Sequence, residues 1–160
     1  MRAVRTLTVS VAVLVTLAWA GAASALIVPQ RSIASIALNM TRSEVRATKG
    51  DPLHVVHGMN DFGKFTTFKY GRLNVTFQGN AGATGVSTSR TRQFTGKRIH
   101  VGSTEAALSA AYPNLHCRTE FDDFRHCWTG AFRAGKRVTD YLITSDSRRI
   151  WRITVAFVID

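Results

Sequence analysis

The sequence predicts an α+β fold of two tandem repeats, each a short helical segment followed by a four-stranded antiparallel meander, with the helices packed on one sheet face. Three observations predict it: a segment that occurs twice, a helix-capping pattern in each copy, and alternating polarity in the segments that follow. The 160 residues, 45% of them hydrophobic, suit one ordinary domain and exclude large multidomain enzymes and collagen-like chains.

The repeated segment comprises residues 36–45 and 99–108, which align without gaps, and each copy then reaches a proline. The alignment extends slightly beyond both segments and preserves apolar and hydroxyl positions. The matched pairs are Ile36 with Ile99, Leu38 with Val101, Thr41 with Thr104, Val45 with Leu108 and Ala47 with Ala110.

Each copy is expected to begin a helix of about two turns, which is too short to be stable alone in water. Thr41 is the predicted N-cap of the first helix, and Glu44 completes a capping box with it. Thr104 is the predicted N-cap of the second helix. Val45 and Leu108 are expected to point toward a sheet.

Alternation of apolar and polar residues predicts strands after each helix. In residues 73–78 the odd positions are expected to face the core and the even positions the solvent. In residues 150–159 we expect Trp151 and Ile153 on one face and Arg152 and Thr154 on the other. The predicted strands are Leu53–His57, Phe65–Tyr70, Leu73–Gln78 and Thr84–Ser89, then Leu115–Thr119, Phe124–Thr129, Arg137–Thr144 and Ile150–Ile159.

With helices on one face, the other face of the sheets is expected to be open to solvent and available to a partner. Aromatic residues and arginine dominate binding hot spots, so an arginine on this face and a phenylalanine in a turn beside it are the strongest candidates. The predicted partner-binding residues are Phe62, Asn74, Thr76, Gln78, Arg152 and Thr154.

The N-terminus has the three parts of a secretory signal peptide: basic Arg2 and Arg5, an apolar run, and the small residues Ala23-Ser24-Ala25 at a cleavage site. The rival interpretation is a transmembrane anchor, but the apolar run is short for a span of about 20 residues. The predicted organisation is a signal peptide (1–25), a first repeat (26–89), a basic connector (90–98) and a second repeat (99–160). We therefore expect a secreted or extracytoplasmic protein.

Export also predicts the state of the two cysteines, Cys117 and Cys127, because an even number in an oxidising compartment favours a disulfide. A metal pair and a thiol redox pair are the alternatives. Nine residues separate the two cysteines, so neither the redox motif nor the usual zinc spacing is present.

Basic residues outnumber acidic ones by 21 to 10, for a net charge of +11. Removing residues 1–25, which hold two arginines and no acid, leaves +9. The connector contributes Arg90, Arg92, Lys97 and Arg98 without an acidic residue, and is a candidate site for anionic wall polymer or lipid head groups. Export argues against nucleic acid. The alternative is a basic surface that binds nothing.

We expect no catalytic residue, metal or cofactor. His116 and His126 flank the cysteines, but a zinc site would need a third ligand. Glu120, Asp122 and Asp123 cluster in one loop beside arginines, which favours a solvated turn over a catalytic pair or a calcium site. The sequence contains no hydrolase or phosphate-loop motif.

Residues 38–45, followed by Gly50-Asp51-Pro52, resemble the LGMT-x-x-EV and LG-x-P signature of small envelope lipoproteins of the SmpA/OmlA kind. Two such units in tandem resemble beta-lactamase inhibitory protein. The resemblance covers about residues 33–158 and implies a helix-plus-sheet fold with a binding surface. Asn39 departs from the glycine of the motif, which Gly102 keeps in the second copy. The first copy also lacks a cysteine pair.

The sequence therefore predicts a secreted, non-catalytic protein that engages another extracellular or envelope protein, as an inhibitor or assembly factor, through an open sheet face. The alternative is a basic wall-associated protein that binds anionic polymer. An uncharacterised hydrolase is the third and least supported interpretation. The identity of the partner does not follow from the sequence.

Overall fold

The computed structural model describes residues 26–120 and 124–159. The predicted signal peptide and the two acidic loop residues Asp122 and Asp123 lie outside the described residues.

Strands dominate the described chain, and its two helices are short. Three strands precede the first helix: β1 (Leu26–Val28), β2 (Ser32–Ile33) and β3 (Ile36–Ala37). Five strands follow it and precede the second helix: β4 (His54–Asn60), β5 (Gly63–Tyr70), β6 (Leu73–Gln78), β7 (Ala83–Thr88) and β8 (Phe94–Thr95). The later strands are β9 (His116–Glu120), β10 (Phe124–Gly130), β11 (Arg137–Thr144) and β12 (Ile150–Phe157), and the helices are α1 (Arg42–Lys49) and α2 (Glu105–Ala111).

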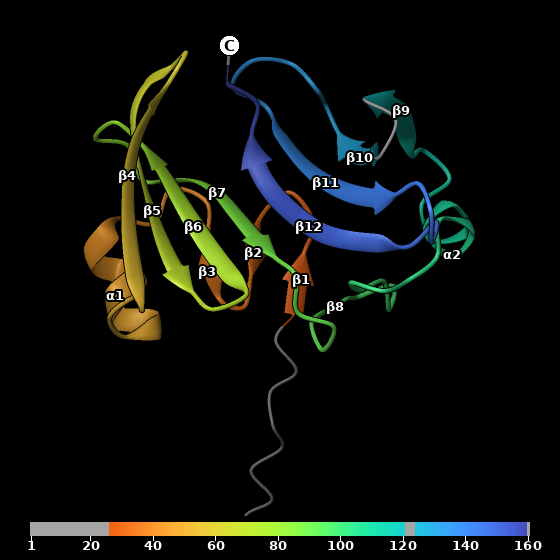
Figure 1. Cartoon of the computed structure of the whole chain (residues 1–160), viewed down its shortest axis with the longest axis horizontal. Coiled ribbons are helices and arrows are strands. Elements are labelled where there is room, and N and C mark those ends of the chain that lie inside the picture. The colour runs from red at the N-terminus through yellow and green to blue at the C-terminus, as the bar shows by residue number, and fades with distance from the viewer. Residues whose placement is uncertain (1–25, 121–123, 160) are drawn as a thin grey trace, which may run out of the picture.

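The main sheet has eight strands in the order β4-β5-β6-β7-β12-β11-β10-β9. Every neighbouring pair is antiparallel, and the pairing of β7 with β12 joins strands from the two parts of the chain. A second sheet of four short strands, β3-β2-β1-β8, is mixed because β1 pairs parallel with β8. Figure 1 shows the small sheet near the middle of the long sheet, with α1 and α2 toward its two ends.

The predicted α+β class of two helix-plus-meander repeats is wrong. The fold is mostly β: one continuous eight-stranded antiparallel sheet and a second, mixed sheet. Residues 26–37 carry no strand signal in the sequence, because each of the three strands there has only two or three residues. Positive φ angles at Gln30, Ala34 and Ser35 separate these strands, so no period of two develops.

The core lies between one face of the main sheet and a layer made by the helices and the small sheet. The predicted alternation along β6 explains how this strand contributes to the core. Leu73, Val75 and Phe77 are buried, and the residues between them are half-buried. Val45 of α1 and Leu108 of α2 are both fully buried in the same cluster. Each two-turn helix therefore contributes one completely buried aliphatic residue to the core.

Backbone contact joins the segment before α1 to β7. Asn39 N–H donates to the carbonyl of Ala83 at 2.9 Å, and Ala83 N–H donates to the carbonyl of Met40 at 2.8 Å. Gly82 permits this approach, because a Cβ there would collide with the backbone of Asn39. Asn39 itself has a φ of 71°, a left-handed conformation that asparagine tolerates better than most residues.

A register shift near the start of β12 corrects one predicted orientation. Leu142 pairs with Arg152, but the next residue, Ile143, pairs with Ile150, so Trp151 is an extra residue on β12. Trp151 was expected to face the core with Ile153. Its side chain is instead 49% exposed, whereas Ile153 is completely buried.

Both predicted threonines cap their helices. Thr41 Oγ1 accepts from Glu44 N–H at 3.3 Å, and Thr41 N–H donates to Glu44 Oε2 at 2.7 Å, which forms a capping box. The hydrogen bonds from the Thr41 backbone and hydroxyl lower the pKa of the Glu44 carboxyl. Thr104 Oγ1 accepts from Ala107 N–H at 3.2 Å.

We expect Thr41→Ala and Thr104→Ala each to lower the free energy of unfolding by about 1 kcal/mol, because each removes the acceptor for an N-terminal helix N–H. Denaturant melts of the two variants measure the losses. Thr48→Ala, at the exposed end of α1, is the control for removing a threonine elsewhere in a helix. Losses no larger than that of Thr48→Ala would show that the caps do not contribute.

Candidate functional site

The open face of the main sheet carries a groove of about 480 Å³ that crosses the junction of β7 and β12. Its volume lies within the range of ligand-binding clefts. The lining residues come from both parts of the chain: Asn60, Phe62, Thr76, Gln78, Thr84, Gly85, Arg118, His126, Trp128, Phe132, Val138, Asp140, Arg152, Thr154, Ala156, Phe157, Val158 and Ile159.

Small residues at the centre of the sheet explain the hollow. Gly85 of β7 pairs with Ala156 of β12, and these two residues form part of the groove floor. Larger side chains stand on either side of this floor, Gln78 on β6 and Trp128 on β10. Successive residues of a strand point to opposite faces of the sheet. The residues that shape the groove can therefore be small or bulky without changing the residues that pack in the core on the other face.

Five of the six predicted partner-binding residues line the groove: Phe62, Thr76, Gln78, Arg152 and Thr154. Asn74 is half-buried on the same strand as Thr76 and Gln78, but it lies outside the groove lining. Asn74 comes two residues before Thr76 in β6, and there it pairs with the exposed Lys69 of β5. The alternation of polar residues along β6 and β12 therefore places Thr76, Gln78, Arg152 and Thr154 on the face that carries the groove.

Charged residues lie together in the part of the groove formed by β10, β11 and β12. His126 Nδ1 lies 3.2 Å from Asp140 Oδ1. Burial raises the pKa of the Asp140 carboxyl, and the neighbouring His126 and Arg152 partly offset this effect. The guanidinium of Arg152 lies 5.2 Å from the centre of the Trp151 ring. Its buried Nε has no hydrogen-bond partner within the described residues.

Aromatic side chains form the apolar side of the groove near β9 and β10. The Trp128 ring stacks on His116 with centres 5.8 Å apart and contacts Phe132 at 5.2 Å. Arg118 lies 5.8 Å above the Phe132 ring. Phe132 is 49% exposed, so this cluster presents aromatic surface to the solvent as well as to the groove.

The sequence prediction missed His126, Trp128, Phe132 and Asp140 as members of this site. His126 and Trp128 are two residues apart on β10, so the same period of two could have placed both on the open face. Asp140 is followed directly by the apolar run Tyr141–Ile143, and a carboxylate next to such a run is a sequence signal that could have identified it. Phe132 follows β10 in a loop and has no periodic signal.

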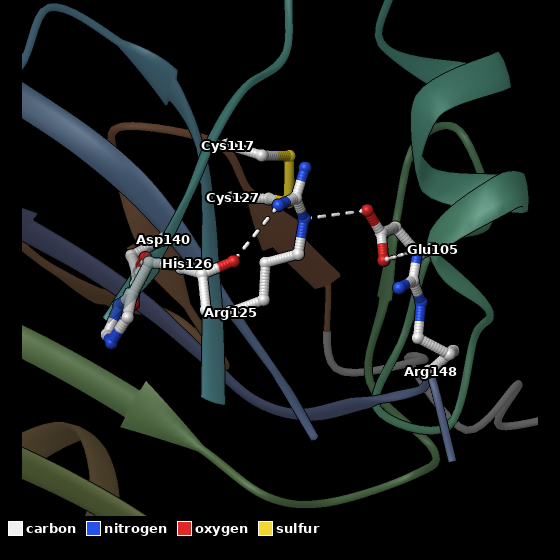
Figure 2. The surroundings of a disulfide bond; sticks show 8 residues. Glu105, Cys117, Arg125, His126, Cys127, Asp140 and Arg148 are labelled. Atoms are coloured by element: carbon white, nitrogen blue, oxygen red, sulfur yellow. Dashed lines mark hydrogen bonds and ion pairs between the residues drawn. A yellow bond between two sulfur atoms is a disulfide. The ribbon is translucent and has the colours of Figure 1, made fainter. Parts of the chain in front are cut away.

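The predicted disulfide between Cys117 and Cys127 is confirmed, and these two residues face each other in the pairing of β9 with β10. Figure 2 shows Glu105 of α2 beside the disulfide, between two arginines. Glu105 Oε1 accepts from Arg125 Nε at 2.9 Å, and Oε2 lies 2.9 Å from Arg148 Nη2. The side chain of Glu105 is only 12% exposed. Its two ion pairs join α2 to β10 through Arg125 and to the turn before β12 through Arg148.

Within the described residues, one group of potential metal ligands is close enough to share an ion: Glu105 with Cys117 and Cys127. Both sulfurs are in the disulfide and Glu105 is engaged by arginines, so these residues do not fit a metal site. His116 and His126, the histidines of the zinc alternative, have different surroundings. The first stacks on Trp128 and the second lies against Asp140.

The predicted basic connector is partly engaged in contacts within the fold. Arg90 Nη2 donates to the Tyr70 carbonyl at 2.9 Å, and Lys97 Nζ donates to the Ala111 carbonyl at 2.6 Å. Arg92 and Arg98 are exposed, and Arg98 has a positive φ of 62° in the turn after β8. All four basic residues are therefore exposed, and two of them also bond to backbone carbonyls of the fold.

No helix in the described part of the chain is long and apolar enough to cross a membrane. The disulfide is compatible with an extracytoplasmic protein.

No family model and no curated protein matches the sequence. Among solved structures, the chain is similar to a DUF4309 family protein, YjgB, from Bacillus subtilis, with a TM-score of 0.51 and 16% sequence identity. The match covers 77% of this chain and 82% of that chain. At this identity the similarity concerns the fold alone.

We expect Cys127→Ser to lower the free energy of unfolding by at least about 2–3 kcal/mol, because the disulfide closes a short loop in the unfolded chain. The serine hydroxyl at this completely buried position adds to the loss. Melting of the wild type with and without reductant separates the two effects. If reduction leaves the wild-type melt unchanged, the disulfide does not stabilise the fold.

Stability should depend on pH through Asp140. A carboxyl whose pKa is raised on folding binds a proton more readily in the folded chain, so its contribution to stability falls as pH rises through that pKa. The stability of the wild type relative to Asp140→Asn should therefore be greatest near about pH 3 and decline toward about pH 7.

Denaturant melts of both proteins across this pH range measure the difference. Asp146→Asn, which changes an exposed aspartate in the turn before β12, is the control for loss of one carboxylate. If the difference between wild type and Asp140→Asn rises with pH, the burial of Asp140 is not the dominant effect on its proton.

Proposed function

We propose that this protein is a secreted, non-catalytic binding protein that engages another extracellular or envelope protein through the groove on the open face of its main sheet. Its N-terminal 25 residues act as a cleaved signal peptide. The observation that carries the proposal is the joint lining of one groove by Phe62, Gln78, Arg152 and Trp128, which come from distant parts of the chain.

The chemistry of the groove supports a protein partner with an acidic side chain beside an apolar one. Arg152 has a buried Nε without a hydrogen-bond partner among the residues that the structure describes, and its planar guanidinium can pair with a carboxylate in two contacts. Trp128 and Phe132 offer aromatic surface a short distance along the same face. A central arginine beside aromatic anchors is the usual composition of a protein-binding hot spot.

The resemblance of residues 38–45, followed by Gly50-Asp51-Pro52, to small envelope lipoproteins of the SmpA/OmlA kind favours a binding role over a catalytic one. The groove combines one histidine, one aspartate and arginines, which serve recognition of charge. The wide, shallow form of a sheet face favours a protein surface over a small substrate that must be enclosed.

The alternative is a basic wall-associated protein that binds anionic polymer through the connector. The exposed side chains of Arg92 and Arg98 favour it. Against it, Arg90 and Lys97 already donate to backbone carbonyls, so a polymer would have to compete with these two contacts for their N–H groups. Polymer binding by exposed charges would also be weakened strongly by salt.

We expect Arg152→Gln combined with Phe62→Ala to abolish capture of the natural partner, because the double variant removes the arginine and the exposed aromatic anchor of the groove. The measurement is capture from culture supernatant and envelope extract on immobilised protein, followed by chemical cross-linking and mass spectrometry. The wild type should give cross-links next to the groove, and capture should persist at high salt.

Arg92→Gln in the exposed connector is the matched control and should capture as the wild type does. Thermal melts of all variants show that each is folded. If the double variant captures the same protein as well as the wild type, the binding site is not the groove. If Arg92→Gln alone loses capture, or if salt abolishes it, the connector and an anionic polymer replace the groove and its protein partner.

A further inference from the structure

The first strand of the main sheet, β4, has an uncovered edge. It pairs with β5 on one side and is the terminal strand in the sheet order, so its other side has no strand beside it within the described residues. Six of its seven residues are exposed, and Gly58 is the exception. Figure 1 shows β4 at the outer margin of the sheet, away from β9 at the opposite margin.

Exposed apolar residues are concentrated on this edge. Nine large hydrophobic side chains are exposed in the described chain, and five of them lie within residues 53–62. Leu53 and Met59 are each 70% exposed. Such a concentration on one strand and its turn is unusual for a surface that faces only water. The five residues are Leu53, Val55, Val56, Met59 and Phe62.

The edge also lacks the features that normally prevent strands from pairing between molecules. Lysine, proline, bulges or inward-pointing charges protect most free edges. Residues 53–60 contain no lysine, arginine, aspartate, glutamate or proline, in a chain with a net charge of +11. By contrast, the opposite edge strand β9 carries Arg118, which lies above Phe132.

We propose that β4 pairs antiparallel with β4 of a second copy about a two-fold axis, so that two main sheets continue into one. In the register centred on His57, Val55 lies opposite Met59 of the second copy, and this apolar pair occurs twice. His54 lies opposite Asn60 of the second copy. The strand is therefore complementary to itself, which an isologous interface requires.

The charge of the chain favours a second copy at this edge over any other place on the surface. Two molecules that each keep a net charge of +9 after removal of residues 1–25 repel, and the repulsion is weakest where the contacting segment itself is uncharged. Two-fold pairing also gives a closed dimer, because the β4 edge of each copy is then covered by the other. Pairing of β4 with β9 of another copy would instead leave one free edge at each end and continue into filaments. The dimer goes beyond the proposed function, since it uses the edge strand, which meets the groove only at Asn60 and at Phe62 in the adjoining turn.

Val55→Lys tests the interface, because it replaces both Val55–Met59 contacts with a charged side chain of the type that protects natural edges. Sedimentation velocity over a range of concentrations measures self-association of the protein produced from the full sequence. We expect the wild type to dimerise and Val55→Lys to weaken the dimer by roughly tenfold or more. Ser109→Lys on the exposed face of α2 adds the same charge and should dimerise as the wild type does.

The register has its own test. His57→Cys places one thiol per subunit next to the two-fold axis, so a short bis-maleimide should capture the dimer efficiently, whereas Ser109→Cys should give little capture. Circular dichroism melts confirm that each variant is folded. A wild type that stays monomeric at the highest concentration reached overturns the proposal. A dimer that Val55→Lys leaves intact and His57→Cys does not capture overturns it equally.

Discussion

The antiparallel pairing of β7 with β12 is the constraint on which the rest of the structure depends. Through it, the strands that follow α1 and those that follow α2 form one sheet instead of two. Val86 of β7 lies between Val75 of β6 and Val155 of β12, and all three are completely buried. A continuous apolar stripe therefore crosses the junction, and neither set of strands has to bury a complete core by itself.

The same pairing creates the candidate site on the opposite face. Gly85 and Ala156 meet at the junction, and an added Cβ on Gly85 would lie 3.7 Å from Ala156 Cβ, an ordinary contact. The absence of bulk at this point is therefore a property of the sequence and not a requirement of the backbone. One strand pair thus supplies core contacts on one face and the floor of the groove on the other.

The sequence predicted the local features well and their assembly poorly. Strand alternation and the capping threonines are signals within ten residues, and the positions they indicated for Gln78, Arg152 and Thr41 agree with the structure. The small sheet and the joined main sheet depend on contacts between distant residues, such as Ile27 with Thr95, which no local period encodes. The exposed position of Trp151 depends on a register shift fixed by the neighbouring strand.

The two ends of the sheet hold their short helices by different chemistry, which explains why only one end has a disulfide. At the first end, Arg42 and Arg46 of α1 lie 4.8 Å and 4.6 Å from the centres of the Phe77 and Phe68 rings. Because these rings are already buried in the core, α1 is attached directly to the sheet.

At the second end, Glu105 of α2 is held by Arg125 on β10. That attachment is only as rigid as β10 itself. The disulfide from Cys127 to β9, next to Glu105, fixes β10 at the margin of the sheet. Because Trp128 and His126 are the neighbours of Cys127 on the opposite face, the disulfide that supports α2 also holds one side of the groove in place.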